Sequence, residues 1–445
     1  MTHAALEACR ALMIQEGLPE AVVATFAHHH RQVAAGATGQ LREADLRPAG
    51  AGEVSSWASV APFQDAGREA LAQTAVIKLN GGLGTTMGLR GPKGALVVKE
   101  GHTFFDLAAV QVIHLNRRHR TRVPFLTMDS FATRARTAEL RQSHPALPAH
   151  VSPAFLQNKY PKLLVPSLEP ARWHADPELA WNPPGHGDFY AAIADSGVLA
   201  ELRSQGIRYA FVSNIDNLGA TLDPAILGWF AAQRLPFLME VCHRGPMDRK
   251  GGHLAVRRSD GQLLLRERAQ TAPEDLEAFE DTARHVFFNT NNLWIDLVAL
   301  EQALARHAGI LPLDVILNRK RLVPKDERTP EVYQLETAIG AAIAAFPGAK
   351  ALEVPRHRLI PVKNCEDLLV VLSDRYTLEA DGSVRPALEA TPTIRVQLEE
   401  AYFGTLDRLH ARLDGVPSLK ACRSLVVTRD IRLSADLRLE GDVTL

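Results

Sequence analysis

The chain has 445 residues, of which 23% are charged, and its 50 lysines and arginines almost balance its 51 aspartates and glutamates. This length allows two or three domains with a large core, while the balanced charge provides no overall field that would recruit nucleic acid or an anionic membrane. The four cysteines lie far apart and form no Cys-x-x-Cys pair, which argues against a zinc site or a disulfide framework.

The N-terminal segment, residues 1–74, begins with apolar residues at helical spacing, namely Leu6, Cys9, Leu12, Met13, Val22, Val23 and Phe26. It lacks the basic region and the apolar region that a signal peptide has. No apolar stretch of the chain approaches the roughly 20 residues that span a bilayer. We therefore expect an N-terminal helical segment in a cytoplasmic protein that has no membrane or nucleic-acid partner.

From residue 75 to 372, short apolar runs alternate with helical ones, which is typical of a sheet with helices on both faces. The expected strands are Ala75–Leu79, Val123–Met128, Tyr209–Val212, Phe237–Val241 and Val286–Phe288. The expected helices are Phe104–His119, Tyr190–Ser204 and Pro224–Gln233. Ligands bind at the carboxyl ends of strands in such sheets. We therefore expect the loops at 80–93, 129–130, 213–217 and 242–252 to outline a cleft.

A glycine-dense loop, residues 79–93, directly follows the first of these strands. Its glycines are Gly81, Gly82, Gly84, Gly88 and Gly91. Glycine has no Cβ to keep backbone amides away from a polyanion, and it permits the positive φ angles that a concave nest of N–H groups requires. Lys93, at the end of the loop, supplies a mobile positive charge. This pattern predicts a phosphate-binding loop, and a turn-rich surface loop without a ligand is the alternative.

The spacing of the glycines excludes the two commonest nucleotide motifs. A P-loop requires Gly-Lys-Ser/Thr, but here Pro92 separates Gly91 from Lys93 and no hydroxyl follows the lysine. A dinucleotide fingerprint requires Gly-x-Gly-x-x-Gly, but the third glycine, Gly88, comes one residue too late. The loop therefore predicts another way of binding phosphate, and a dehydrogenase is disfavoured.

The C-terminal apolar residues follow a six-residue repeat in which spacings of two and four alternate. They are Leu425, Val427, Ile431, Leu433, Leu437, Leu439, Val443 and Leu445. Such a repeat indicates a hexapeptide β-helix. The repeats suffice for little more than one coil, whose open end would need covering by a neighbour or a second subunit. Two ordinary hairpin strands are the alternative.

The loop at 79–93 resembles the signature of the eukaryotic-type UDP-glucose pyrophosphorylases, which are UTP–glucose-1-phosphate uridylyltransferases. Further blocks resemble that family in the same order. They are Gln157–Lys162, Trp181–Asp188, Phe211–Thr221, Met239–Val241 with Lys250–Gly252, Phe288–Trp294 and Val354–Lys363. The resemblance extends over about residues 70–445. Several blocks in the same order are more specific than any one block alone.

The resemblance implies an α/β fold with a Rossmann-like, GT-A-like nucleotidyltransferase mixed sheet in a catalytic domain, residues 75–372. A C-terminal domain, residues 373–445, would end in a short left-handed β-helix segment. The implied reaction makes UDP-glucose and pyrophosphate from UTP and glucose 1-phosphate, with Mg²⁺ as cofactor. Because the chain ends after little more than one coil of the β-helix, we expect a monomer or a small homo-oligomer.

The same resemblance assigns roles to single residues. The implied nucleotide-binding residues are Leu79, Asn80, Gly81, Gly82, Lys93, Met128, Gln157, Gly185 and Lys363. The implied sugar-phosphate-binding residues are Gly81, Gly82, His186, Asn214, Ile215, Asp216, Glu240 and Asn291. The amide of Gln157 would bond the uracil edge, since an amide donates and accepts at once, and Met128 and the backbone of Gly185 would line the same base pocket. Lys93, Lys363 and Asp216 would be catalytic, with Asp216 also the magnesium ligand.

Each of these residues has a plainer structural alternative. Asp216 could fix a turn or cap a helix, although the next expected helix begins too far along the chain for a cap. His186 could be an ordinary loop residue, and Lys363 could be a solvated charge at the end of a strand. Glu240 and Asn291 could equally satisfy buried backbone groups.

Two other functions remain open from the sequence. A broad-specificity UDP-sugar or UDP-N-acetylhexosamine pyrophosphorylase would use the same chemistry, but N-acetylhexosamine relatives resemble Gly-Gly-x-Gly-Thr-Arg-Leu-Gly, whereas this chain has Thr86-Met87-Gly88. A non-catalytic UDP-sugar sensor is the third hypothesis. The presence of both predicted lysines and the aspartate counts against a sensor, because binding alone does not require a full set of charges around the phosphates.

Overall fold

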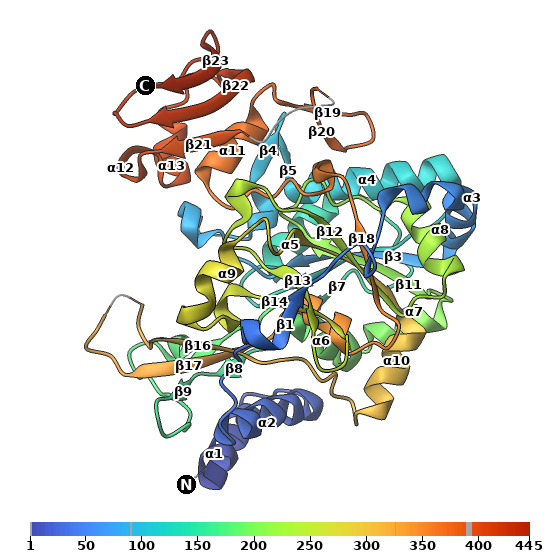
Figure 1. The fold of residues 1–445 in the computed structure, drawn as a ribbon, viewed down its shortest axis with the longest axis vertical. Helices are drawn as coiled ribbons and strands as arrows, with labels where there is room; N and C mark the ends of the chain where they lie inside the picture. Colours follow the sequence, from blue (N-terminus) through green and yellow to red (C-terminus); the bar gives the residue numbers. More distant parts are fainter. Residues whose placement is uncertain (1, 90, 325, 389–393) are drawn as a thin grey trace. The chain divides into compact units, whose positions relative to one another are not determined.

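The computed structural model describes residues 2–89, 91–324, 326–388 and 394–445 and has a mixed α/β fold (Figure 1). The chain divides into two compact units, each built from three separate stretches. Unit 1 comprises the described residues as far as Ala61, then Phe155–Ala210 and Trp229–Glu353. Unit 2 comprises Pro62–Ala154, Phe211–Gly228 and Val354–Leu445.

The helices of unit 1 are α1 (Thr2–Gln15), α2 (Glu20–Ala34), α6 (Phe189–Asp195), α7 (Val198–Ser204), α9 (Leu276–Glu280) and α10 (Leu297–Arg306). Its longer strands are β12 (Phe237–His243), β13 (His253–Arg257), β14 (Leu263–Arg266), β15 (Phe287–Asp296), β16 (Ile316–Arg321), β17 (Glu331–Glu336) and β18 (Lys350–Glu353). Its short strands are β1 (Leu46–Pro48), β2 (Val54–Ser55), β8 (Tyr160–Pro161), β9 (Leu163–Leu164) and β10 (Trp181–Asn182).

The sheet of unit 1 is mixed. Strands β2, β18, β12 and β15 follow one another, and β18 is parallel to both β2 and β12, whereas β15 is antiparallel to β12. Strand β13 pairs antiparallel with β1, β14 and β15. Helices α1 and α2 cover a separate apolar cluster in which Phe26 packs with Tyr160, Leu163 and Leu335.

The helices of unit 2 are α3 (Gln64–Ala70), α4 (Phe104–His119), α5 (Arg134–Gln142), α11 (Cys365–Leu372), α12 (Glu400–Phe403) and α13 (Leu406–His410). Its strands are β3 (Thr74–Asn80), β4 (Val97–Lys99), β5 (His102–Thr103), β6 (Phe125–Asp129), β19 (Tyr376–Leu378), β20 (Val384–Pro386), β21 (Arg395–Leu398), β22 (Ser418–Val427) and β23 (Arg438–Thr444). The chain passes from one unit to the other within three further elements. They are β7 (Ala154–Leu156), β11 (Tyr209–Asn214) and α8 (Pro224–Ala232).

Strand β3 forms the centre of the sheet in unit 2, between β11 and the parallel strand β6. Every residue of β3 is buried. Lys78 is among them. A buried charge requires hydrogen-bond partners, and the Lys78 ammonium group donates to the Ser213 hydroxyl at 2.8 Å and to the Ala220 carbonyl at 2.7 Å.

Helix α4 begins and ends where its sequence predicts. Thr103 and Asp106 form a capping box, in which each side chain accepts a hydrogen bond from the backbone of the other residue. Arg120 ends the helix in the left-handed region, with φ of 52°. The last turn contains Arg117, Arg118 and His119, which compensate the negative end of the helix dipole.

The five expected strands and the expected helices at α4 and α8 are confirmed, but two expectations differ from the structure. The single helix expected over Tyr190–Ser204 is wrong: Gly197, with φ of 77°, separates α6 from α7. The strand expected at Val286–Phe288 continues to Asp296 as β15. Within its buried asparagine run, the Asn292 side chain donates to Glu240 at 3.0 Å, which offsets part of the cost of burying these amides.

At the C-terminus, β21, β22 and β23 form a parallel three-stranded sheet, seen at the red end of the colour scale in Figure 1. The hairpin alternative is therefore wrong, because the strands of a hairpin are antiparallel. Of the repeat residues, Leu425, Val427, Leu433 and Leu439 are buried. Among the helices that the structure describes, none has both the length and the apolar character that crossing a membrane requires.

Candidate active site

The glycine loop of unit 2 folds back on the end of β3. The backbone N–H of Lys93 donates to the Gly82 carbonyl at 3.1 Å, and Leu83 forms a bridge with Pro92. Only one of the loop glycines whose backbone is described has a positive φ, namely Gly88 at 71°. Arg90 lies outside the described residues. The fold of the loop brings Lys93 back to the carboxyl end of β3.

Two further segments of unit 2 reach the same point. The backbone N–H of Ile215 donates to the Leu79 carbonyl, and that of Val362 donates to the Asp216 carbonyl, both at 3.1 Å. Asn217 forms a bridge with Pro361. The end of β3, the turn after β11 and the segment before α11 are therefore held together by backbone hydrogen bonds.

These segments place two lysines on one carboxylate. The ammonium group of Lys93 lies 2.8 Å from Asp216 Oδ2, and that of Lys363 lies 2.6 Å from the same oxygen. Asp216 is 7% exposed. Burial alone would raise the pKa of Asp216, but the charges of Lys363 and Lys93 outweigh burial and hold this pKa below its usual value. Lys93, Lys363 and Asp216, the three residues expected to be catalytic, therefore converge at one point.

The backbone of Lys363 is fixed by the start of α11. Asn364 caps this helix by accepting from the Asp367 N–H at 2.8 Å, and the Asp367 carboxylate accepts from the Lys363 N–H at 2.7 Å. This reciprocal pattern satisfies two backbone donors at the helix start. It holds the base of the Lys363 side chain in place while the side chain itself remains half exposed.

Two oxygens beside the charge cluster are buried and have no hydrogen-bond partner within the described parts of the chain. They are Asp216 Oδ1 and Asn80 Oδ1. The described residues contain no group of three or more histidine, cysteine, aspartate or glutamate side chains that could enclose a metal ion. Any metal held here would therefore rely on Asp216 together with oxygens from a substrate.

The structure shows that Asn80 is oriented by residues that the sequence analysis missed. Its amide nitrogen donates to Asp129 Oδ1 and to Thr137 Oγ1, both at 2.8 Å. Burial raises the pKa of Asp129 to about 6, although hydrogen bonds from Asn80, Thr127 and Thr137 oppose the shift. With both amide hydrogens engaged, the Asn80 carbonyl oxygen keeps a fixed direction. A polar residue at the end of an apolar strand was the available signal for Asp129.

A second missed residue is Asn217, which is 4% exposed. Its side-chain oxygen accepts from the backbone N–H of Gly219 at 3.1 Å and of Ile360 at 2.8 Å, and its nitrogen donates to the Arg358 carbonyl at 3.1 Å. Asn217 thus joins the Asp216 turn to the segment that leads to Lys363. The sequence signal was its position directly after Asp216.

Of the residues predicted to form the uracil pocket, Gln157 and Gly185 lie in unit 1, whereas Met128 lies in unit 2. The Gln157 amide donates to the Gly185 carbonyl at 2.8 Å. Gly185 has φ of 76°, and a Cβ there would lie 2.5 Å from the Thr337 carbonyl oxygen, so this position requires glycine. The Ile339 N–H donates to His186 Nδ1 at 2.8 Å, which leaves the proton of the neutral ring on Nε2.

Glu240 and Asn291 also lie in unit 1. The two carboxylate oxygens of Glu240 accept from Trp294 Nε1 at 2.9 Å and from the Asn292 amide at 3.0 Å. Asn291 has φ of 58° and donates its N–H to Asn289 Oδ1 at 2.9 Å. The carboxylate of Glu240 thus bonds two side chains, whereas the structural alternative named backbone groups. An assignment of Glu240 and Asn291 to glucose hydroxyls stays a prediction.

The predicted site residues are therefore divided between the two units. Unit 2 contains Leu79, Asn80, Gly81, Gly82, Lys93, Met128, Asn214, Ile215, Asp216 and Lys363, whereas unit 1 contains Gln157, Gly185, His186, Glu240 and Asn291. Met128 is buried in β6 and pairs with Leu79 across the sheet. The loops expected at 80–93, 129–130 and 213–217 belong to unit 2, and the loop at 242–252 belongs to unit 1.

Comparison with known proteins identifies the family. A sequence model of the UTP–glucose-1-phosphate uridylyltransferases matches residues 23–440. The chain belongs to this family. The resemblance found in the sequence blocks is thereby confirmed, and the family is one of nucleotidyltransferase enzymes.

Curated members of the uridylyltransferase family are similar over most of the chain. The UTP–glucose-1-phosphate uridylyltransferase of Saccharomyces cerevisiae is 39% identical over 376 residues, which cover 84% of this chain and 74% of the relative. A probable enzyme of the same name from Schizosaccharomyces pombe is 37% identical over 382 residues, which cover 85% of this chain and 74% of the relative.

Solved structures of similar proteins share the fold. A mutant UDP-glucose pyrophosphorylase from Leishmania major, crystallised with UDP-glucose, has a TM-score of 0.92 and 40% identity, and the match covers 99% of this chain and 94% of that one. UDP-glucose phosphorylase from Trypanosoma brucei has a TM-score of 0.90 and 38% identity, with 99% and 95% covered.

Proposed function

We propose that the protein joins UTP to glucose 1-phosphate, making UDP-glucose and pyrophosphate. The single observation that carries this proposal is the meeting of two lysines, far apart in the chain, on the carboxylate of Asp216. The two substrates are both polyanions and repel each other, so the protein must bring them together with positive charge. Family membership supports the same reaction.

The reaction needs positioning more than it needs a nucleophile from the protein. A phosphate oxygen of glucose 1-phosphate attacks the α-phosphorus of UTP, and a new P–O bond forms. The bond between the α-phosphorus and the bridging oxygen breaks, and its electron pair leaves with pyrophosphate. Because the attacking and leaving oxygens are anionic near neutral pH, no strong base is required. Lys93 and Lys363 would stabilise the negative charge on the transferring phosphate.

The residues present fit a magnesium ion. Asp216 Oδ1 is a buried carboxylate oxygen without a described partner, and magnesium usually takes one or two carboxylates together with phosphate oxygens. A bound Mg²⁺ would supply further neutralisation of phosphate charge. We expect Asp216→Asn to raise the magnesium concentration at which turnover is half-maximal. A magnesium titration identical to that of the unchanged protein would contradict the metal role.

The residues of unit 1 would read the base and hold the sugar phosphate. Gln157 offers an amide for the uracil edge, and the proton on His186 Nε2 offers a donor for the phosphate of glucose 1-phosphate. Gly185, which cannot carry a side chain in its present conformation, would let the backbone approach the base. Asn214, Ile215, Glu240 and Asn291 remain proposed contacts of the sugar side.

We also propose that the sheet is of the Rossmann-like, GT-A-like nucleotidyltransferase kind, in a catalytic domain over 75–372 that follows a helical segment over 1–74. The C-terminal domain, 373–445, would end in a short left-handed β-helix segment, which the parallel order of β21, β22 and β23 supports. For a monomer or small homo-oligomer, sedimentation equilibrium should give one or a few multiples of 48.7 kDa. A mass of eight chains would contradict this.

A magnesium-dependent assay across nucleoside triphosphates and sugar 1-phosphates tests the proposal. We expect pyrophosphate release with UTP and glucose 1-phosphate, and Gln157→Ala should weaken the preference for UTP over CTP. Equal turnover of glucose, galactose and N-acetylglucosamine 1-phosphates would instead favour a broad-specificity UDP-sugar pyrophosphorylase. Release of no pyrophosphate from any pair would favour the UDP-sugar sensor.

A further inference from the structure

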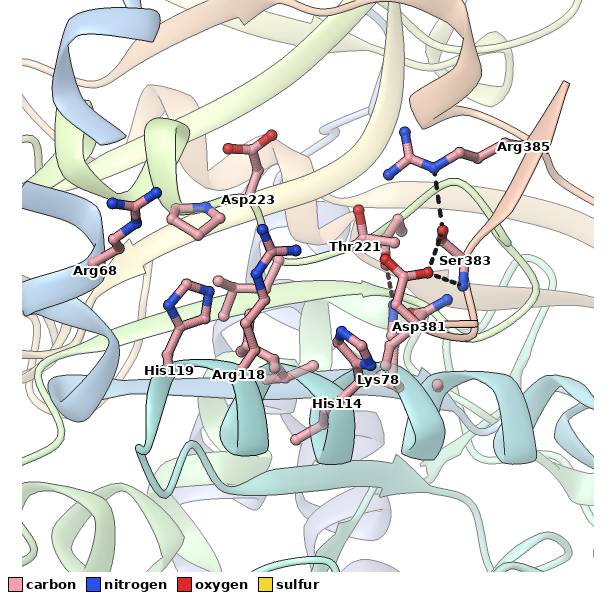
Figure 2. Close-up of a pocket in the computed structure, with 18 of the residues that line it drawn as sticks. Arg68, Lys78, His114, Arg118, His119, Thr221, Asp223, Asp381, Ser383 and Arg385 are labelled. Carbon is pink, nitrogen blue, oxygen red and sulfur yellow. Dashed lines mark hydrogen bonds between the residues drawn. The ribbon is translucent and has the colours of Figure 1, made fainter. Parts of the chain in front are cut away.

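Unit 2 contains a cavity of about 210 Å³ that includes none of the predicted site residues (Figure 2). Its walls come from α3, α4, β3, the segment at 220–224 and the hairpin of β19 and β20. The hairpin is held against α4 by a hydrogen bond from the Gln111 amide to the Gly382 carbonyl at 2.9 Å. All of these elements belong to one compact unit, so the cavity is a feature of that unit.

Positive charge is in excess around this cavity. The charged lining residues are Arg68, Lys78, Arg118 and Arg385 against Asp223 and Asp381, and His114 and His119 also line it. Figure 2 shows Arg118 and His114 rising from α4, with Arg385 reaching in from the hairpin on the other side. Arg68 is paired with Asp65 at 2.8 Å. With that carboxylate included, four cations against three carboxylates leave a net charge of about +1, with both histidines counted as neutral.

The two carboxylates already have hydrogen-bond donors of their own. Asp381 Oδ1 accepts from the Ser383 N–H at 2.9 Å and from the Ser383 hydroxyl at 2.6 Å. Asp223 Oδ1 accepts from the Ala225 N–H at 2.7 Å at the start of α8. Neither Arg118 nor Arg385 forms an ion pair with any residue that the structure describes. Arg385 Nε donates to the Ser383 hydroxyl at 3.2 Å. The terminal amino groups of Arg385 and the guanidinium group of Arg118 therefore face the cavity as possible donors to a ligand.

Helix-dipole compensation explains only part of this arrangement. Arg118 and His119 lie in the last turn of α4, where cations stabilise a helix. Arg68 and Arg385 lie on other elements and gain nothing from that dipole. Burial, followed by the charges of Arg118 and Arg68, lowers the pKa of His119. The C-terminal end of α4 carries about half an elementary negative charge, which is smaller than the excess of positive charge around the cavity.

We propose that this cavity binds a small phosphate-bearing molecule, at a site separate from the Asp216 cluster. Guanidinium groups match the geometry of phosphate oxygens and can donate two parallel hydrogen bonds. The Thr221 hydroxyl adds a short donor on the same walls, whereas the Ser383 hydroxyl already donates to Asp381. The ligand could be free phosphate or a phosphate monoester, and both present the same dianion to Arg118 and Arg385.

The cavity is connected to the catalytic turn through its floor. Lys78 donates to the Ala220 carbonyl at 2.7 Å, and Arg358 donates to the Thr221 carbonyl at 2.9 Å. These carbonyls lie a few residues after Asp216 on the same turn. A ligand held against Lys78 or Thr221 thus contacts the backbone segment that carries Asp216.

Calorimetric titration of the full chain tests the site, with inorganic phosphate and glycerol 3-phosphate as probes and citrate as a carboxylate of the same sign. We expect Arg118→Ala and Arg385→Ala each to weaken the affinity for at least one phosphate probe by about tenfold, the effect of losing one charge-assisted hydrogen bond. Arg117→Ala is the matched control, because it removes the same charge from the neighbouring exposed position of α4 without touching the cavity. The preferred probe distinguishes free phosphate from a monoester.

Several results would overturn the proposal. One is an equal loss of phosphate affinity in Arg117→Ala, which would show general attraction of phosphate to a positive surface. Another is citrate binding as tightly as phosphate. The absence of saturable binding at millimolar phosphate would do so too. A loss confined to Lys363→Ala would assign the phosphate signal to the Asp216 cluster. Because Arg118 and Arg385 are exposed, their alanine variants should keep the thermal midpoint of the unchanged protein when phosphate is absent, so lost binding cannot be lost folding. Failure of this test leaves the uridylyltransferase assay unaffected.

Discussion

At the scale of single residues, the shared carboxylate of Asp216 predicts the effect of removing either lysine. Lys93→Ala and Lys363→Ala should each lower turnover by about 10²–10³, the usual effect of removing one preorganised group that stabilises transition-state charge. The fold should survive, because each lysine contributes only its ammonium group to the cluster. Steady-state kinetics and circular dichroism measure the two effects, with Lys420→Ala, an exposed lysine of the same unit, as control. Normal turnover in either variant would remove that lysine from the mechanism.

The depressed pKa of Asp216 predicts how pH acts on the cluster. A carboxylate whose folded pKa lies below its unfolded value, near ~3.9, contributes stability above that value and loses it as pH falls through the folded pKa. The thermal midpoint of the unchanged protein should therefore exceed that of Asp216→Asn by a constant amount from about pH 5 to pH 8, and the difference should shrink below about pH 4. Asp436→Asn, at an exposed position, should show no such difference. A gap that closes already near neutral pH would contradict the ion-pair account.

The sequence predicted the three charged residues that meet in the structure, but not the residues that orient the side chains around them. Lys93, Asp216 and Lys363 stand in ordered blocks whose residue types suit phosphate chemistry. Asp129 and Asn217 act through hydrogen bonds to partners that are distant in the chain or that depend on the fold of a turn. The tertiary fold decides which of these hydrogen-bond partners meet, and the local spacing of residues in the sequence does not reveal it.

At the scale of elements, the start of α11 predicts a coupling between helix capping and catalysis. Asn364→Ala removes the cap that accepts from the Asp367 N–H, and it should cost about 1 kcal/mol of stability. Because Asp367 also holds the Lys363 backbone, turnover should fall as well, though less than in Lys363→Ala. Urea unfolding and steady-state kinetics measure the two effects.

Asp296→Ala supplies the matched control for that prediction. It removes the cap of α10, in which Asp296 accepts from the N–H groups of Val298 and Ala299, and it also breaks an ion pair with Arg208. We expect it to lower stability at least as much as Asn364→Ala while leaving turnover unchanged. Equal losses of turnover in both variants would show that general destabilisation, and not the position of Lys363, is responsible.

Elements with complete local signals were predictable, and those decided by context were not. Helix α4 has its capping box and its basic last turn written in the sequence. The break between α6 and α7 depends on Gly197 adopting a positive φ, and a glycine inside an apolar pattern is compatible with either outcome. Strand β15 continues through an asparagine run in which Asn292 donates to Glu240, a partner distant in the chain that local spacing does not reveal.

At the scale of the whole molecule, the chain alternates between its units, and each unit takes three separate stretches. Apolar spacing in a sequence indicates only local periodicity, so it divides a chain into consecutive segments. It does not indicate which distant segments pack into the same core. The cluster under α1 and α2 illustrates this, since Phe26 packs there with Leu163, Val315 and Leu335 from three later parts of the chain.

The cluster under α1 and α2 predicts a variant that affects substrate affinity more than turnover. Phe26 is fully buried, and its ring meets that of Tyr160 edge-on at 5.2 Å. Tyr160 lies in β8, which begins shortly after Gln157 in the chain. Strand β8 pairs with β10, and β10 ends shortly before Gly185. Phe26→Ala should cost about 3–5 kcal/mol through the cavity it leaves. The resulting loosening of β8 and β10 should raise the KM for UTP.

Turnover at saturating UTP should largely persist in Phe26→Ala, because Lys93, Lys363 and Asp216 belong to the other unit and are held there by their own hydrogen bonds. Thermal midpoints and a split between KM and kcat measure the effect. Ile14→Ala is the control, since this side chain of α1 is 62% exposed and should change neither quantity. A fall in kcat with an unchanged KM would show that the N-terminal helices act on the charge cluster and not on the predicted base-reading residues.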